Sequence, residues 1–265
     1  MQFYRLKELL ENLYISYKHK FSSKDPVWIL HRFGDEKDIE LISLITSAYA
    51  YGSVDQINRF TRNLLERIGN KPYEFTINFE KRKDKKFLKD LYYRFNTEMD
   101  LVNLFCSLNR NLIKHTSLKN LFLSHYGKND ENIIPALTGF ANELNLNSKN
   151  KGGEYYHYLI SNPVNKSTCK RMNLFLRWMV RKDEIDLGVW KEMDASKLVI
   201  PVDTHVARVS KKLKLVVRKS IDLKFAVELT NKLKEFDSLD PVKYDFALCH
   251  VGIDKKDILN SKIAV

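Results

Sequence analysis

The sequence predicts an all-α protein, and three observations lead to that prediction. Glycine and proline, which interrupt helices, are scarce, with nine and six among 265 residues. Apolar residues recur at helical spacing from end to end, whereas the alternation typical of strands is hard to find. The hydrophobic fraction of 44% is that of a folded chain long enough for one large domain or two closely packed lobes.

Five stretches carry the i, i+3, i+4, i+7 pattern of an amphipathic helix. In chain order they are 41–48, 101–112, 172–179, 206–213 and 226–236. The best candidate for a strand is 197–202, but its proline and its length favour an extended connection between helices.

Basic residues exceed acidic ones by 45 to 33, which gives a net charge of +12. A cationic excess on this scale favours polyanions, of which phosphate backbones are the commonest. A generally lysine-rich composition is the alternative explanation. From charge alone we therefore expect a nucleic acid as the partner.

The three cysteines and the apolar runs limit the cofactor and the compartment. Cys106, Cys169 and Cys249 are widely spaced, which argues against an iron–sulfur cluster and against a structural zinc site of the usual spacing. So sparse a count fits a reducing compartment. The first residues have no signal-type apolar core, and no run approaches the ~20 apolar residues needed to span a bilayer. We expect a cytoplasmic protein without membrane contact.

The first stretch with chemical interest is 201–209. An extended apolar run stops at Asp203, and a helical stripe begins directly after it. Aspartate is a preferred N-cap because its carboxylate accepts the free N–H groups of the first turn. A cap with no further role is the simpler interpretation of this residue.

The second stretch is 165–173. Ser167 or Thr168 is predicted to cap the helix that runs through Met179, which puts Lys170 in its first turn. The positive end of the helix dipole disfavours an ammonium there and favours the free amine. Lysines that form Schiff bases react as that free amine. A solvated surface lysine is the alternative.

Together the two stretches resemble the helix-hairpin-helix (HhH-GPD) DNA glycosylase superfamily, which includes endonuclease III. The motif Val-Asp-Thr-His at 202–205 is similar to the superfamily signature residue for residue. Lys170 and Asp203 match its lyase lysine and its catalytic aspartate, and their separation of 33 positions resembles the archaeal 8-oxoguanine glycosylase branch. The resemblance spans about residues 35–253 and is most specific at 166–181 and 200–209.

This resemblance implies one HhH-GPD-like unit over 1–265, with two helical lobes and a central cleft. One lobe would comprise about 1–51 with 183–265 and present Asp203. The other would comprise about 52–182 and carry the hairpin with Lys170. The implied activity is base-excision repair, in which Lys170 attacks the sugar of an extruded nucleotide and Asp203 stabilises the developing charge. The resulting Schiff base would add lyase activity at the abasic site, and 8-oxoguanine is the favoured base.

Further residues receive roles from the same resemblance and from their charge. Contacts with DNA phosphates are predicted for Lys166, Ser167, Thr168, Arg171, Arg208 and Lys211. The base pocket is predicted to include Tyr49, Tyr51, Leu174, Trp178, Asp245 and Cys249. The sequence departs from the superfamily at two places, because Lys166 and Thr168 replace hairpin glycines and Cys249 replaces a pocket aromatic residue. We expect no cofactor and no metal, apart from a possible monovalent cation at the hairpin, and a monomer acting on double-stranded DNA.

Three alternatives stay open. The first is a non-catalytic nucleic-acid binder on the same scaffold. The second is a glycosylase for an alkylated base or uracil. The third is an all-helical interaction protein in which Asp203 is only a cap and Lys170 only a surface residue, and it predicts side chains too far apart to share a substrate atom.

Overall fold

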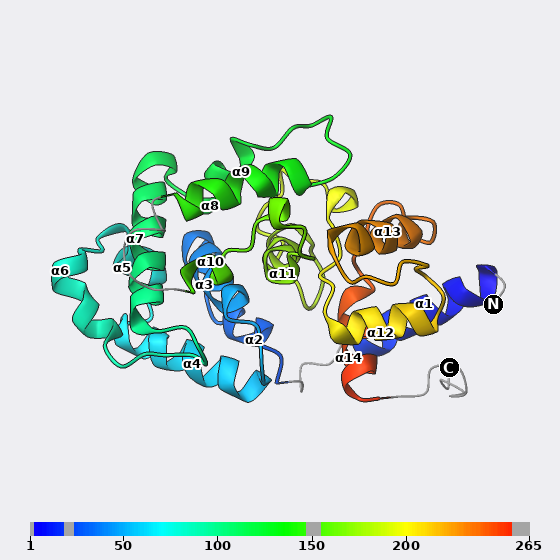
Figure 1. The fold of residues 1–265 in the computed structure, drawn as a ribbon, viewed down its shortest axis with the longest axis horizontal. Coiled ribbons are helices and arrows are strands. Elements are labelled where there is room, and N and C mark those ends of the chain that lie inside the picture. The colour runs from blue at the N-terminus through cyan, green and yellow to red at the C-terminus, as the bar shows by residue number, and fades with distance from the viewer. Residues whose placement is uncertain (1–2, 19–23, 147–154, 256–265) are drawn as a thin grey trace. The chain divides into compact units, whose positions relative to one another are not determined.

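A computed structural model describes residues 3–18, 24–146 and 155–255 as a series of helices joined by short connections (Figure 1). Within these residues the only β pairing is two isolated bridges, Tyr93 with Asn96 and Lys182 with Leu187. The prediction of an all-α fold is therefore confirmed. No helix in the described part of the chain combines the length and apolarity needed to cross a membrane.

The chain divides into two compact units, which we call unit 1 (Met1–Ser23 with Lys166–Val265) and unit 2 (Lys24–Asn165). This division differs from the predicted lobes, which grouped 24–51 with the C-terminal part and 166–182 with the middle of the chain. For 166–182 the reason is that the helix carrying Lys170 forms buried ion pairs with Asp186 and Asp245 of unit 1. The predicted central cleft stays a prediction.

Unit 2 consists of short and medium helices around one long helix. They are α2 (Val27–Leu30), α3 (Glu36–Ala48), α4 (Val54–Arg67), α5 (Pro72–Ile77), α6 (Lys81–Asp84), η1 (Lys85–Leu88), α7 (Glu98–His115), α8 (Leu118–Leu123), α9 (Ile134–Asn145), α10 (Tyr156–Leu159) and η3 (Pro163–Asn165). Helix α7 packs against α5, α8, α9 and α10, and its predicted apolar stripe is buried. A capping box of Thr97 and Asp100 begins it.

Unit 1 combines the N-terminal helix with the C-terminal helices. They are α1 (Phe3–Tyr17), α11 (Lys170–Val180), η4 (Ala195–Lys197), α12 (Thr204–Lys212), α13 (Leu223–Lys234) and α14 (Asp245–Ile253). Helix α14 packs against both α12 and α1. Gly252 permits the close approach of α14 to α12, because a Cβ there would lie 2.8 Å from the Cβ of His205. This contact positions the start of α12, where Asp203 lies.

Candidate active site

Lys170 is the first residue of α11, and the turn before it has an unusual backbone. Cys169 is the N-cap, in the left-handed region with φ 49°. The prediction that Ser167 or Thr168 caps this helix is therefore wrong. The hydroxyl of Ser167 instead accepts the N–H of Cys169 at 3.3 Å, and the Asn173 side chain donates to the Thr168 carbonyl at 3.0 Å. These bonds hold the turn that presents Lys170.

The same turn keeps a glycine-like conformation without a glycine. Lys166 adopts φ 59°, a region that glycine enters most readily. Its carbonyl accepts the N–H of Leu223, the first residue of α13, at 3.1 Å. Lys166 and Ser167 are exposed. The turn therefore holds an exposed lysine in a conformation that glycine adopts most readily.

Asp203 caps α12, as the sequence predicts. Its Oδ1 accepts the backbone N–H groups of His205 at 2.9 Å and Val206 at 2.8 Å. Its Oδ2 lies 3.9 Å from Nζ of Lys170 and accepts from Sγ of Cys249 at 3.7 Å. The side chains of Lys170 and Asp203 are 30% and 21% exposed. An amine and a carboxylate thus meet where a substrate atom can reach both.

The two helix starts are tied to each other by a hydrogen bond. The Thr168 hydroxyl donates to the carbonyl of Val202 at 3.1 Å, which links the turn before α11 to the residue before Asp203. Because both functional groups lie at helix N-termini, the positive ends of two helix dipoles face the same place. Such a place favours negatively charged groups, including phosphate oxygens.

Asp245 lies buried in the first turn of α14 and pairs with Arg177 of α11. Arg177 also bridges to Asp186 at 3.1 Å. Burial raises the pKa of Asp245 to about 7 against the opposing charge of Arg177, and the nearby charge of Asp203 adds to the rise. Oδ1 of Asp245 is buried and has no hydrogen-bond partner among the described residues.

This shifted pKa predicts a stability that depends on pH. An unfolded chain releases the Asp245 proton near the ordinary value of 3.8, whereas the folded protein holds it up to about 7. The contribution of Asp245 to the free energy of unfolding therefore falls as the pH rises through this window. We expect the difference in unfolding free energy between the wild type and Asp245→Asn to decrease from about pH 4 to pH 7 in urea titrations. A difference that stays constant with pH would contradict this.

The other predicted pocket residues fall into two groups. Leu174 is half-buried on α11, and Trp178 is fully buried there. Tyr49 and Tyr51 belong to unit 2, where Tyr49 is buried against Phe60 with ring centroids 4.2 Å apart. The structure thus brings Cys249 to the Lys170–Asp203 pair with Asp245 nearby, and it makes Tyr49 and Trp178 core residues.

The residues predicted to contact phosphates are also placed unequally. Arg171 is only 8% exposed, which puts its side chain inside the protein rather than at a phosphate-accessible surface. Arg208 donates to the Gly252 carbonyl, and Lys211 donates to the Lys219 carbonyl at 2.7 Å. Both side chains remain exposed.

Sequence reasoning missed the buried ion pairs of α11. Arg177 and Arg181 are both buried, although arginine is rarely buried without a partner. Their partners are Asp183, Asp186, Asp240 and Asp245. The signal in the sequence was the spacing of four between the two arginines, which puts both on one side of the stretch 174–181, where all the other residues are apolar.

The chain matches a described protein family. A family model described as "Protein of unknown function (DUF2400)" matches residues 25–254, a range that includes Lys170 and Asp203. No curated protein and no solved structure matches the chain.

Proposed function

This chain belongs to the family described as Protein of unknown function (DUF2400), and we propose that it is a DNA glycosylase with lyase activity. One observation carries the proposal: Nζ of Lys170 lies 3.9 Å from Oδ2 of Asp203, and both side chains are partly exposed. An amine beside a carboxylate is the arrangement that nucleophilic attack by lysine requires, since the carboxylate can take the lysine proton.

The proposed reaction begins with a damaged nucleotide rotated out of the duplex. Lys170 passes a proton to Asp203, and its nitrogen bonds to the anomeric carbon while the glycosidic bond breaks. The base leaves with the electron pair of that bond and takes up a proton. Opening of the sugar ring then gives a Schiff base on Lys170. Removal of a proton from the 2′ carbon expels the 3′ phosphate and cleaves the strand.

The geometry of the site supports this division of roles. Two backbone N–H groups hold Oδ1 of Asp203, so Oδ2 faces Lys170 and the developing positive charge on the sugar. The exposed Lys166 and Ser167 lie in the turn just before Lys170, where a DNA phosphate would be attracted to the helix N-terminus.

The identity of the damaged base is a more specific proposal than the glycosylase activity itself. We propose 8-oxoguanine first, because the separation of 33 positions between Lys170 and Asp203 resembles the archaeal 8-oxoguanine glycosylase branch. A glycosylase for an alkylated base or uracil, and a binder without catalysis, are the alternatives. If Asp203 were only a cap and Lys170 only a surface residue of an interaction protein, the two side chains should lie far apart. The distance of 3.9 Å between Nζ of Lys170 and Oδ2 of Asp203 disfavours this alternative.

The test is trapping with borohydride, which reduces a Schiff base to a stable adduct. Duplexes with a single 8-oxoguanine, uracil or alkylated base are incubated with the wild type, Lys170→Ala and Lys191→Ala. We expect an adduct with the wild type and Lys191→Ala, and a loss of at least about 100-fold with Lys170→Ala. Lys191 is the matched control because it is an exposed lysine of unit 1 outside the proposed site.

Two outcomes would overturn the proposal in different ways. An adduct that persists in Lys170→Ala assigns the nucleophile to another residue. Tight, salt-sensitive binding of every duplex without base release favours the non-catalytic binder.

A further inference from the structure

A hollow of about 540 Å³ lies in unit 2 between α4 and segment 90–94, and we call it the α4 hollow. Its lining residues are Gln56, Arg59, Phe60, Asn63, Arg67, Asp90, Leu91, Tyr92, Tyr93 and Arg94. The lining thus contains three arginines and two tyrosines but only one carboxylate, that of Asp90. A volume of this size is typical of ligand sites, which span roughly 300–1,000 Å³.

The sequence builds this hollow from two periodic patterns. The residues that α4 contributes at 56, 59, 63 and 67 follow helical spacing and form one exposed polar stripe. Segment 90–94 alternates, with 91 and 93 buried and 90, 92 and 94 exposed. Nη1 of Arg67 donates to the carbonyl of Lys89, which ties the helix to the segment. The walls are therefore fixed to each other, and the floor is aromatic and apolar.

Arg94 occupies a strained position on the rim. Tyr93 and Asn96 exchange two backbone hydrogen bonds of 2.9 Å around a tight turn, and Arg94 enters that turn with φ 55°. An arginine in the left-handed region is uncommon, and such outliers gather at functional sites. The Arg94 guanidinium lies 5.8 Å from the centroid of the Tyr51 ring, as in a cation–π contact.

Aromatic rings continue from the hollow along the same surface. Tyr51 stacks on Phe95 at 5.3 Å, and Phe95 contacts Tyr155 at 5.0 Å and Tyr158 at 4.8 Å. Phe95, Tyr155 and Tyr158 are all exposed, and Tyr92 on the rim of the hollow is 74% exposed. Exposed rings beside arginines combine stacking faces for bases with charges for phosphates.

We propose that the α4 hollow and these rings bind single-stranded nucleic acid. A phosphate sits against Arg59 and Arg94, and a base stacks on Tyr92. A strand fits better than a free nucleotide because the stacking faces extend past the hollow to Phe95. This site lies in unit 2 and shares no residue with the Lys170–Asp203 pair, so it does not depend on the proposed glycosylase chemistry.

The experiment measures binding of a labelled, lesion-free oligothymidylate of about ten nucleotides by fluorescence anisotropy. The full chain is compared with the double variant Arg59→Gln/Arg94→Gln, with Tyr92→Leu and with Tyr92→Phe. We expect the double variant and Tyr92→Leu each to weaken binding about tenfold or more, and Tyr92→Phe to retain it. The double variant should also reduce the slope of log affinity against log salt by about 0.7, because the two arginines contact one phosphate.

Arg62→Gln is the matched control, since Arg62 is an exposed arginine of α4 that does not line the hollow. An equal loss with Arg62→Gln would overturn the proposal, because binding would then follow overall charge. If thymidine monophosphate displaced the oligonucleotide at an equal concentration, the proposed binding of a strand would be wrong, and the hollow would be a site for a free nucleotide. Lys170→Ala should bind this oligonucleotide as the wild type does. Failure of the binding test would therefore leave the glycosylase proposal standing, and failure of the glycosylase test would leave this proposal standing.

Discussion

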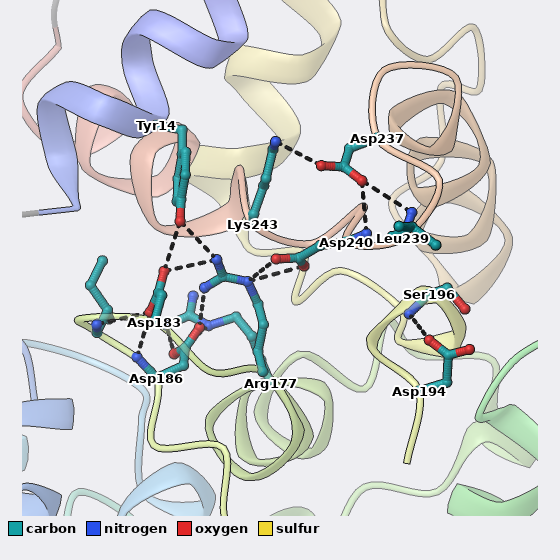
Figure 2. Close-up of polar contacts among 12 residues, drawn as sticks. Tyr14, Arg177, Asp183, Asp186, Asp194, Ser196, Asp237, Leu239, Asp240 and Lys243 are labelled. Carbon is teal, nitrogen blue, oxygen red and sulfur yellow. Dashed lines mark hydrogen bonds and ion pairs between the residues drawn. The ribbon is translucent and has the colours of Figure 1, made fainter. Parts of the chain in front are cut away.

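Replacement of Arg181 by methionine is expected to lower the free energy of unfolding by about 3–5 kcal/mol, the usual effect of removing one partner from a buried ion pair. The Arg181 side chain is 4% exposed and pairs with Asp183, Asp186 and Asp240 at 2.6–2.8 Å. It also donates to the Tyr14 hydroxyl at 3.3 Å, so α1, the loop after α11 and the loop before α14 meet around one guanidinium. Figure 2 shows Tyr14, Asp183, Asp186 and Asp240 gathered in this network.

The directions of the pKa shifts in this network support the expected loss of stability. Burial alone would lower the pKa of Arg181, but the charges of Asp186, Asp240 and Asp183 outweigh it and raise that pKa above its ordinary value. Burial raises the pKa of both Asp186 and Asp240, with Arg181 opposing the rise. Without the guanidinium, these carboxylates lose the partner that keeps them ionised, and they take up protons more readily as the pH falls. The loss in Arg181→Met should therefore shrink towards low pH.

Urea denaturation of the variant and of Arg218→Met measures this difference. Arg218 is the matched control because it is an arginine of unit 1 that forms a partly exposed ion pair with Asp222, four positions along the chain. A surface pair contributes little because water screens both charges, so we expect a far smaller loss with Arg218→Met. Similar losses of unfolding free energy in the two variants would contradict this prediction, because the buried ion pairs of Arg181 would then stabilise the fold no more than a surface pair does.

Local features of this fold could be predicted because their causes lie within a few residues. The apolar stripe at 101–112 is buried in α7, and Asp203 caps α12 through its own following turn. The helix at 172–179 was also expected, and it ends at Val180. Apolar spacing and capping depend on residues within one or two helical turns, so both can be predicted from a short stretch of sequence.

Other features depend on partners that are distant along the chain. The left-handed turn at Cys169 has local bonds, but two further bonds join it to distant residues: the Thr168 hydroxyl donates to the Val202 carbonyl, and the Leu223 N–H donates to the Lys166 carbonyl. The unit boundaries differ from the predicted lobes for the same reason, since Arg177 pairs with Asp245 across 68 positions. The meeting of Lys170 with Asp203 was expected only from the resemblance to a known superfamily.

Asp203→Asn is expected to reduce the rate of base release by about 10²–10³-fold, if the chain is the glycosylase that we propose, since loss of one stabilising group in a transition state has effects of this size. The variant keeps the shape of the side chain and removes its charge. Asparagine is an N-cap about as good as aspartate, so helix α12 should remain and the free energy of unfolding should change little. A loss of activity would then report on the charge that faces Lys170.

Asp35→Asn is the matched control for this variant. Asp35 caps α3 by accepting the N–H groups of Lys37 at 2.9 Å and Asp38 at 3.1 Å, the same geometry that Asp203 has in α12. Single-turnover release of the base, measured beside urea unfolding, separates the two effects. Activity that survives in Asp203→Asn would leave this carboxylate with the role of a cap, as Asp35 has. Loss of activity in Asp203→Asn but not in Asp35→Asn assigns the effect to the carboxylate oxygen 3.9 Å from the Lys170 amine.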